Sequence, residues 1–153
     1  MTSESRIVRA ATAEEWEEAA RLQQLTNPSA WTAAQWMSAR ESTTNTLWLT
    51  LRGAEAVAFL LESTVLDELE VLDMGVSGAH RRQGLAAQLL LEVLDSARTR
   101  DVRSVHLEVR VGNEPARRLY ESVGMRQSGL RRAYYRNPVE DAVLMHLDLV
   151  GKS

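Results

Sequence analysis

The sequence has no cysteine among its 153 residues. Disulfides, thiolate metal sites and a cysteine nucleophile are therefore excluded. Histidine is also scarce, and the three that occur, His80, His106 and His146, do not have the spacing of a paired metal-binding motif such as HExxH. We therefore expect no metal site.

Long apolar runs are missing as well. None approaches the roughly 18 residues that a membrane-spanning helix needs, and the segment from Met1 to Arg6 lacks the apolar core of a signal peptide. We therefore expect a cytoplasmic protein without a membrane partner. The chain is 44% hydrophobic and 25% charged. This is an ordinary globular balance, so residues 1–153 are predicted to form a single domain.

Lysine is almost absent, with Lys152 as the only one. The net charge of −3 hides an asymmetry, because residues 1–76 carry 5 basic and 12 acidic side chains whereas residues 77–153 carry 13 basic and 9 acidic ones. The acidic half could attract a cationic substrate and the basic half an anionic ligand, although a solvated surface of uneven composition is the simpler explanation. An acidic protein is a poor candidate for nonspecific nucleic-acid binding, so no direct nucleic-acid partner is expected.

Apolar patterns typical of strands recur along the chain. They cover residues 7–10, 47–52, 56–64, 68–76, 104–109, 125–132 and 142–149. A turn through Gly53 joins the second and third of these strands, and a loop over residues 133–141 is predicted to join the last two.

Helical spacing of apolar residues predicts the other elements. The first helix is expected to start at a capping box of Thr12 with Glu15 and to end at Asn27-Pro28, and a second starts at a box of Thr32 with Gln35. A long helix runs from Leu85 to Ala97, and a last helix is capped by Asn113 and ended by Gly124. The order βααβββαβαββ fits neither an all-parallel doubly wound sheet nor a helix bundle. It favours a mixed sheet with helices on both faces.

The segment from Met74 to Ala87 joins a strand to the strongest helix through a turn that contains Gly75, Gly78 and Gly84. Such a turn directs several backbone N–H groups to one point, and the helix dipole adds partial positive charge, so phosphate or pyrophosphate could bind there. The turn lacks the lysine of a Walker A loop and the glycine spacing of a dinucleotide fingerprint. From the residues alone, a structural turn is an equally good interpretation.

Two polar side chains on otherwise apolar elements are candidates for proton transfer. Glu108, on the strand at 104–109, could act as a general base, or it could be a solvent-facing glutamate paired with Arg110. Tyr120, on the apolar stripe of the last helix, could donate a proton, or it could be a core tyrosine with its hydroxyl at the edge of the core. Taken singly, the structural alternative is favoured for both.

The aromatic residues divide into two groups. Trp16, Trp36 and Trp48 lie on predicted helices and strands and are expected in the core. Trp31 lies between two helices, and Tyr134 and Tyr135 lie in the predicted loop. Aromatic rings at such positions can line a binding groove, so these three are candidate ligand contacts.

Arg81-x-x-Gly84-x-Ala86 resembles the Q/R-x-x-G-x-G/A motif of the GNAT acetyltransferases, which bind acetyl-coenzyme A. Three further segments resemble the RimI-type enzymes of that superfamily: LEVR, N and LYESVG within residues 107–124, RRAYY with EDA within 131–142, and NPSAWT at 27–32. RimI-type enzymes acetylate the N-terminal alanine of a small-subunit ribosomal protein. The resemblance covers nearly the whole chain. It implies an α/β (α+β) GNAT fold, with a mixed, mostly antiparallel sheet of about seven strands flanked by about four helices.

The resemblance also implies roles for single residues. Glu108 would be the proton acceptor and Tyr120 the proton donor. Acetyl-coenzyme A would be bound by Met74, Gly75, Val76, Arg82, Gln83, Gly84, Leu85, Ala86, Ala87 and Asn113. Trp31, Tyr134 and Tyr135 would contact the acceptor, which is implied to be the N-terminal peptide of a ribosomal protein.

The chain departs from the family's pattern at three positions, and none of them removes a group with an implied role. Ala86 takes the last motif position, Gly112 stands where serine is common, and Met125 replaces a usual phenylalanine. The implied reaction is a direct attack by the acceptor amine in a ternary complex, without metal. Two alternatives stay open: an acetyltransferase for protein lysine or a small-molecule amine, and a non-catalytic module that binds acetyl-coenzyme A.

Overall fold

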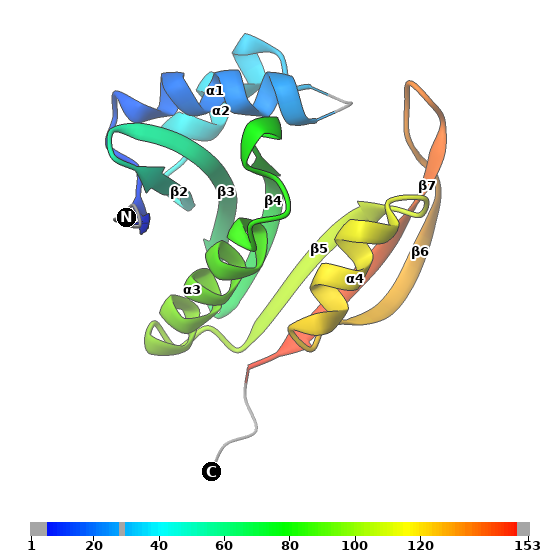
Figure 1. Cartoon of the computed structure of the whole chain (residues 1–153). Helices are drawn as coiled ribbons and strands as arrows, with labels where there is room; N and C mark the ends of the chain where they lie inside the picture. Colours follow the sequence, from blue (N-terminus) through cyan, green and yellow to red (C-terminus); the bar gives the residue numbers. More distant parts are fainter. Residues whose placement is uncertain (1–5, 28–29, 150–153) are drawn as a thin grey trace.

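The computed structural model describes residues 6–27 and 30–149. In this part of the chain, seven strands form one sheet and four α-helices pack against it (Figure 1). The strands are β1 (Arg6–Ala10), β2 (Asn45–Arg52), β3 (Glu55–Val65), β4 (Glu68–Val76), β5 (Ser104–Arg110), β6 (Arg126–Tyr135) and β7 (Glu140–Asp148). The helices are α1 (Glu15–Thr26), α2 (Ala33–Glu41), α3 (Leu85–Thr99) and α4 (Glu114–Ser122), with a 3-10 turn at Gly78–His80. None of the helices described here is long and apolar enough to cross a membrane.

The strands follow the order β1-β2-β3-β4-β5-β7-β6, and every neighbouring pair is antiparallel except β4 with β5. The predicted mixed, mostly antiparallel sheet is therefore confirmed. Successive residues of β3 face opposite sides: Leu60 joins a core under α3 and α4, while Phe59 joins a second core under α1 and α2. Trp16 and Trp36 are buried in this second core, and Trp48 is half-buried against the first.

The parallel ladder between β4 and β5 ends where Val71 faces Leu107. Residues 72–76 of β4 and 108–110 of β5 lie beyond it, and Figure 1 shows the two strands diverging from there. The register between β3 and β4 shifts at Leu72, which is an extra residue in β4. Bulges of this kind bend and twist a strand. The sheet therefore splits locally and leaves two strand edges facing each other.

Two predicted helix starts are confirmed at the level of single hydrogen bonds. Thr32 accepts from the Gln35 N–H, and the Gln35 side chain accepts from the Thr32 N–H, which is a complete capping box. The Asn113 side chain accepts from the Ala116 N–H at 3.2 Å and so begins α4. Gly124 follows α4 with φ of 103°, the left-handed conformation that glycine adopts without strain.

The predicted start of α1 at Thr12 is wrong, because the helix begins at Glu15. The Glu15 carboxylate accepts from the Thr12 N–H at 2.9 Å, but it also binds the Arg9 guanidinium through two contacts of 2.8 Å. These hydrogen bonds, first those from Arg9, lower the pKa of Glu15 to about 2. The Glu15 N–H donates to the Thr12 backbone oxygen at 3.1 Å, so residues 12–15 form a turn before the helix. α1 ends at Thr26, close to the predicted end, and Pro28 lies outside the described residues.

The predicted loop over residues 133–141 is wrong for most of its length. β6 continues to Tyr135 and pairs there with Glu140, the first residue of β7. The register shifts just before this pair, where Ala133 has φ of 50° and its N–H donates to Asp141 at 2.7 Å. The irregularity breaks the apolar alternation, which is why the sequence pattern did not indicate a strand here.

Candidate active site

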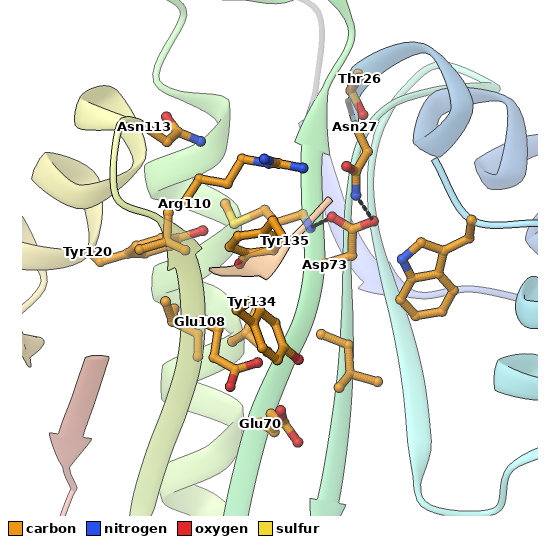
Figure 2. Close-up of a pocket in the computed structure, with 16 residues that line it drawn as sticks. Thr26, Asn27, Glu70, Asp73, Glu108, Arg110, Asn113, Tyr120, Tyr134 and Tyr135 are labelled. Atoms are coloured by element: carbon orange, nitrogen blue, oxygen red, sulfur yellow. Dashed lines mark hydrogen bonds between the residues drawn. The ribbon is translucent and has the colours of Figure 1, made fainter. Parts of the chain in front are cut away.

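A cavity of about 380 Å³ opens between β4 and β5 at the point where their ladder ends (Figure 2). It brings together part of the predicted site: Trp31, Met74, Glu108, Asn113, Tyr120, Tyr134 and Tyr135. It is also lined by residues to which the sequence analysis gave no role in the site, among them Thr26, Asn27, Glu70, Asp73 and Arg110. The cavity thus joins two strands, α4, the end of β6 and the segment between α1 and α2.

Glu108 directly follows the last residue of β5 that pairs with β4, so its side chain lies where the strands separate. Its side chain is 18% exposed, and its Oε2 lies 3.2 Å from Nε of Arg131 on β6. Arg110 forms its ion pair with Glu140, at 3.1 Å. The alternative in which Glu108 pairs with Arg110 is therefore wrong. The carboxylate instead borders the cavity.

Tyr120 satisfies both of its sequence interpretations. It belongs to the core under α3 and α4, with 9% exposure, and it also lines the cavity from α4. Burial raises the pKa of the Tyr120 phenol, and the charge of Asp73 raises it further. The hydroxyl therefore keeps its proton at neutral pH and is available as a donor.

Asp73 is a carboxylate on β4 that the sequence analysis missed. It accepts hydrogen bonds from the side chain of Asn27 at 2.9 Å and from the Met74 N–H at 2.8 Å (Figure 2). The Gln23 side chain donates a third bond, also at 2.9 Å. Burial raises the pKa of Asp73 despite these bonds. The signal in the sequence was an acidic residue inside the apolar run of β4, but only the structure shows what faces it.

Glu70 is the second missed carboxylate, and Figure 2 shows it at the same end of the cavity as Glu108 and Tyr134. Partial burial raises the pKa of Glu70, and the charge of Glu108 adds to the effect. The lining thus has three carboxylates, with Asp73 as the third, against Arg110, which is already paired with Glu140. Such a lining favours a cationic or amine ligand.

The three aromatic candidates all border the cavity. Arg110 lies over the ring of Tyr135, 4.4 Å from its centre, and burial with the charge of Glu108 raises the pKa of Tyr135 to about 12. A hydrogen bond with Glu108 raises the pKa of Tyr134. Trp31 is held through its backbone, because its N–H donates to Oε1 of Gln23 at 3.0 Å.

The predicted phosphate-binding turn begins α3, outside the lining of the cavity. Gly84 precedes the helix with φ of 75°, no side chain of the described residues caps the first turn, and that turn has no acidic residue. Its N–H groups are therefore open to an anion. Gln83 is held by two arginines: Nη1 of Arg6 donates to its backbone oxygen and Nη1 of Arg52 to its side chain, each at 3.2 Å.

Two groups of predicted ligand contacts lie beyond the cavity itself. Gly75 and Val76 form the end of β4, and residues 82–87 form the turn and first helical turn of α3. They follow Met74 of the cavity lining along the chain, so the predicted contacts run from the open edge of β4 to the N-terminus of α3. Within the described residues, no group of three or more His, Asp or Glu side chains could hold a metal ion.

Residues 10–125 match the family model described as the Acetyltransferase (GNAT) family. The chain belongs to the GNAT acetyltransferase family. Its sheet, with a parallel β4–β5 pair that separates above a cavity, is the GNAT fold. Both the family and the solved structures with the same fold are acetyltransferases, so this GNAT protein is one as well.

Individual proteins resemble this GNAT chain closely. The [Ribosomal protein bS18]-alanine N-acetyltransferase of Escherichia coli strain K12 is 39% identical over 103 residues, which cover 66% of this chain and 69% of the relative. The crystal structure of the ribosomal-protein-S18-alanine N-acetyltransferase from Escherichia coli superposes with a TM-score of 0.91 at 26% identity, covering 97% of each chain. Arabidopsis thaliana NAA60 in complex with acetyl-CoA has a TM-score of 0.85 at 18% identity, covering 96% of this chain and all of the other, and shares the fold.

Proposed function

We propose that this protein transfers the acetyl group of acetyl-CoA to the N-terminal alanine of a small-subunit ribosomal protein. The observation that carries the proposal is the cavity at the β4–β5 split, which places Glu108 and Tyr120 on its walls in a chain 39% identical to a bS18-alanine N-acetyltransferase. We also propose that residues 1–153 act as one domain in the cytoplasm, without a nucleic-acid or membrane partner.

The residues present fit acetyl-CoA. The N-terminus of α3 has open N–H groups and no capping side chain from the part of the chain that the structure describes, which suits the pyrophosphate, with contacts from residues 82–87. The edge of β4 beyond the ladder, at Met74, Gly75 and Val76, suits the amide-containing arm of coenzyme A. Asn113 caps α4 through its oxygen and lines the cavity as a further contact. When bound, acetyl-CoA supplies the activated acetyl group as a thioester.

The proposed chemistry is one displacement in a ternary complex. The acceptor nitrogen forms a bond to the acetyl carbon and the bond from that carbon to sulfur breaks, which yields an amide and a thiol. Glu108 takes the proton that the acceptor ammonium must lose, directly or through water. Tyr120 donates its proton to the leaving sulfur, and the backbone N–H near Val76 donates to the thioester oxygen as charge develops on it. The nitrogen loses its second proton as the amide forms, and this proton replaces, through solvent, the one that Tyr120 has given up.

An N-terminal amine suits this site better than a lysine. The pKa of an α-amine is about 7.7–8.0, whereas that of a lysine is about 10.4. Removing the proton from an N-terminus is therefore easier by roughly 3 kcal/mol. Three carboxylates in the lining attract the cationic form before it loses its proton, and the aromatic side chains of Trp31, Tyr134 and Tyr135 supply surface for a peptide.

Acetyl-CoA consumption with two peptides tests this proposal. One peptide has a free N-terminal alanine and no lysine, and the other has a blocked N-terminus and one internal lysine. We expect turnover on the first alone. Turnover on the lysine alone would leave the family assignment intact but contradict the N-terminal acceptor. Binding of acetyl-CoA without turnover on either peptide or on small amines would favour a non-catalytic module.

A further inference from the structure

A second cavity, of about 560 Å³, lies between α1 and α2. We call it the interhelical groove. Its apolar surface is formed by Trp16, Ala20, Trp36 and Met37, and its polar rim by Glu17, Arg21, Gln24 and Arg40 among others. Because the rim has charges of both signs, the groove suits an apolar ligand better than a ligand of one particular charge.

Trp31 lines both the interhelical groove and the cavity between β4 and β5. Its N–H donates to Oε1 of Gln23 at 3.0 Å, its backbone oxygen accepts from Nε2 of Gln24 at 2.6 Å, and its ring packs edge-on against Trp36 at 5.9 Å. Gln23 in turn donates to Asp73 in the first cavity. Trp31 is therefore held by residues of the interhelical groove, and through Gln23 it is linked to Asp73 of the first cavity.

The length of the interhelical groove suits a short extended peptide. Its wall on α1 reaches from Gln24, beside Trp31, to Trp16. This is about 12 Å of helix at 1.5 Å per residue. An extended chain advances about 3.3 Å per residue, so the groove has room for three to four residues.

From this continuity we propose that the interhelical groove binds the acceptor polypeptide beyond its acetylated end, with apolar side chains at about its third to sixth positions. The inference rests on the proposed N-terminal acceptor. The cavity at β4 and β5 has about 380 Å³ for the acetyl-bearing arm and the first acceptor residue, so the rest of the acceptor chain has to leave it. The route over Trp31 leads into an apolar surface that is already formed.

The test compares three peptides that all begin with a free alanine: a tripeptide, a heptapeptide with apolar residues at positions three to six, and a heptapeptide with serine and glycine there. For the wild type we expect KM for the apolar heptapeptide to be about tenfold below that of the other two, with kcat similar for all three. Equal KM values for the two heptapeptides would overturn the inference.

Two variants assign the effect to the groove. Met37→Glu places a charge in its apolar wall, at a side chain that is 48% exposed and so tolerates the change. Leu25→Glu is the matched control on α1, at a 75% exposed side chain outside both linings. Met37→Glu should abolish the gain for the apolar heptapeptide and leave the tripeptide unchanged, while Leu25→Glu should change neither.

The remaining outcomes separate the possible failures. A normal gain in Met37→Glu would overturn the inference, as would a wild-type dimer in sedimentation that Met37→Glu dissociates, because a second copy would then occupy the groove. If no peptide of any length is acetylated at its N-terminus, the proposed function itself fails. If the tripeptide is acetylated without any effect of length, only the groove inference fails.

Discussion

At the residue scale, the molecule places the two proposed proton-transfer groups in one cavity. The proposed proton acceptor, Glu108, is paired with a largely exposed arginine, Arg131, and the proposed donor, Tyr120, is buried with its pKa raised. The family resemblance predicted both positions. It did not predict Asp73 or Glu70. Alternation along a strand shows which side chains point away from the core, but not which residues of other elements lie against them. Asp73 accepts its side-chain hydrogen bonds from Gln23 and Asn27, which lie far from it in the sequence.

The Tyr120→Phe variant tests the proposed proton donor. It keeps the buried ring and removes only the hydroxyl, so the fold should persist while kcat falls by about a hundredfold. The measurement is kcat on the peptide with a free N-terminal alanine, together with acetyl-CoA affinity by calorimetry, which should stay close to that of the wild type. Wild-type kcat in this variant would contradict the role.

The pH dependence of the wild type gives a second measure of the same group. Because burial raises the pKa of Tyr120 above its ordinary value, the protonated and active form persists as the pH rises towards 10. Activity should therefore rise as the acceptor amine loses its proton near pH 8 and then stay level up to about pH 10. A loss of kcat centred below pH 9 that Tyr120→Phe removes would contradict the proposed environment.

At the element scale, the site depends on where the β4–β5 ladder stops. The sequence predicted the bounds of β4 correctly, but it contained no sign that pairing ends at Val71 or that Leu72 is a bulge. Tyr134 and Tyr135 were predicted to lie in a loop because the irregularity at Ala133, like the bulge at Leu72, has no sign in the sequence and interrupts the alternation within β6. Helix caps were more predictable, because a capping box such as that of Thr32 is a local interaction.

The Gly75→Ala variant tests the contact that fixes α1 against β4. A Cβ at Gly75 would overlap Oγ1 of Thr26, on α1, and lie 2.8 Å from Cε1 of Phe59. Because Phe59 is fully buried, we expect a loss of about 1–3 kcal/mol in the free energy of unfolding and weaker acetyl-CoA binding. Chemical denaturation measures the first effect and calorimetry the second.

Gly78→Ala is the matched control for this variant. Within residues 6–27 and 30–149, nothing lies within 4 Å of a Cβ at Gly78, and its φ is not in the left-handed region. Its unfolding free energy should change by less than about 0.5 kcal/mol. Equal stability of the two variants would show that the close approach of α1 and β4 is not needed.

At the scale of the whole molecule, the charge asymmetry of the sequence coincides with the architecture. The acidic part, residues 1–76, ends with β4, and the basic part supplies β5, α4, β6 and β7. Since β4 neighbours β5 in the sheet, the cavity lies at the junction of the two parts. An anionic substrate and a cationic acceptor would thus approach from parts of opposite charge, which composition alone could only suggest.

The central claim is that the cavity at this junction transfers an acetyl group with Glu108 as the base. The most direct test is kcat of Glu108→Gln on the peptide with a free N-terminal alanine, beside Glu114→Gln, which removes a 69% exposed carboxylate on α4. We predict a fall of at least about a hundredfold for Glu108→Gln with unchanged acetyl-CoA affinity, and wild-type kcat for Glu114→Gln. Wild-type turnover in Glu108→Gln would contradict the account.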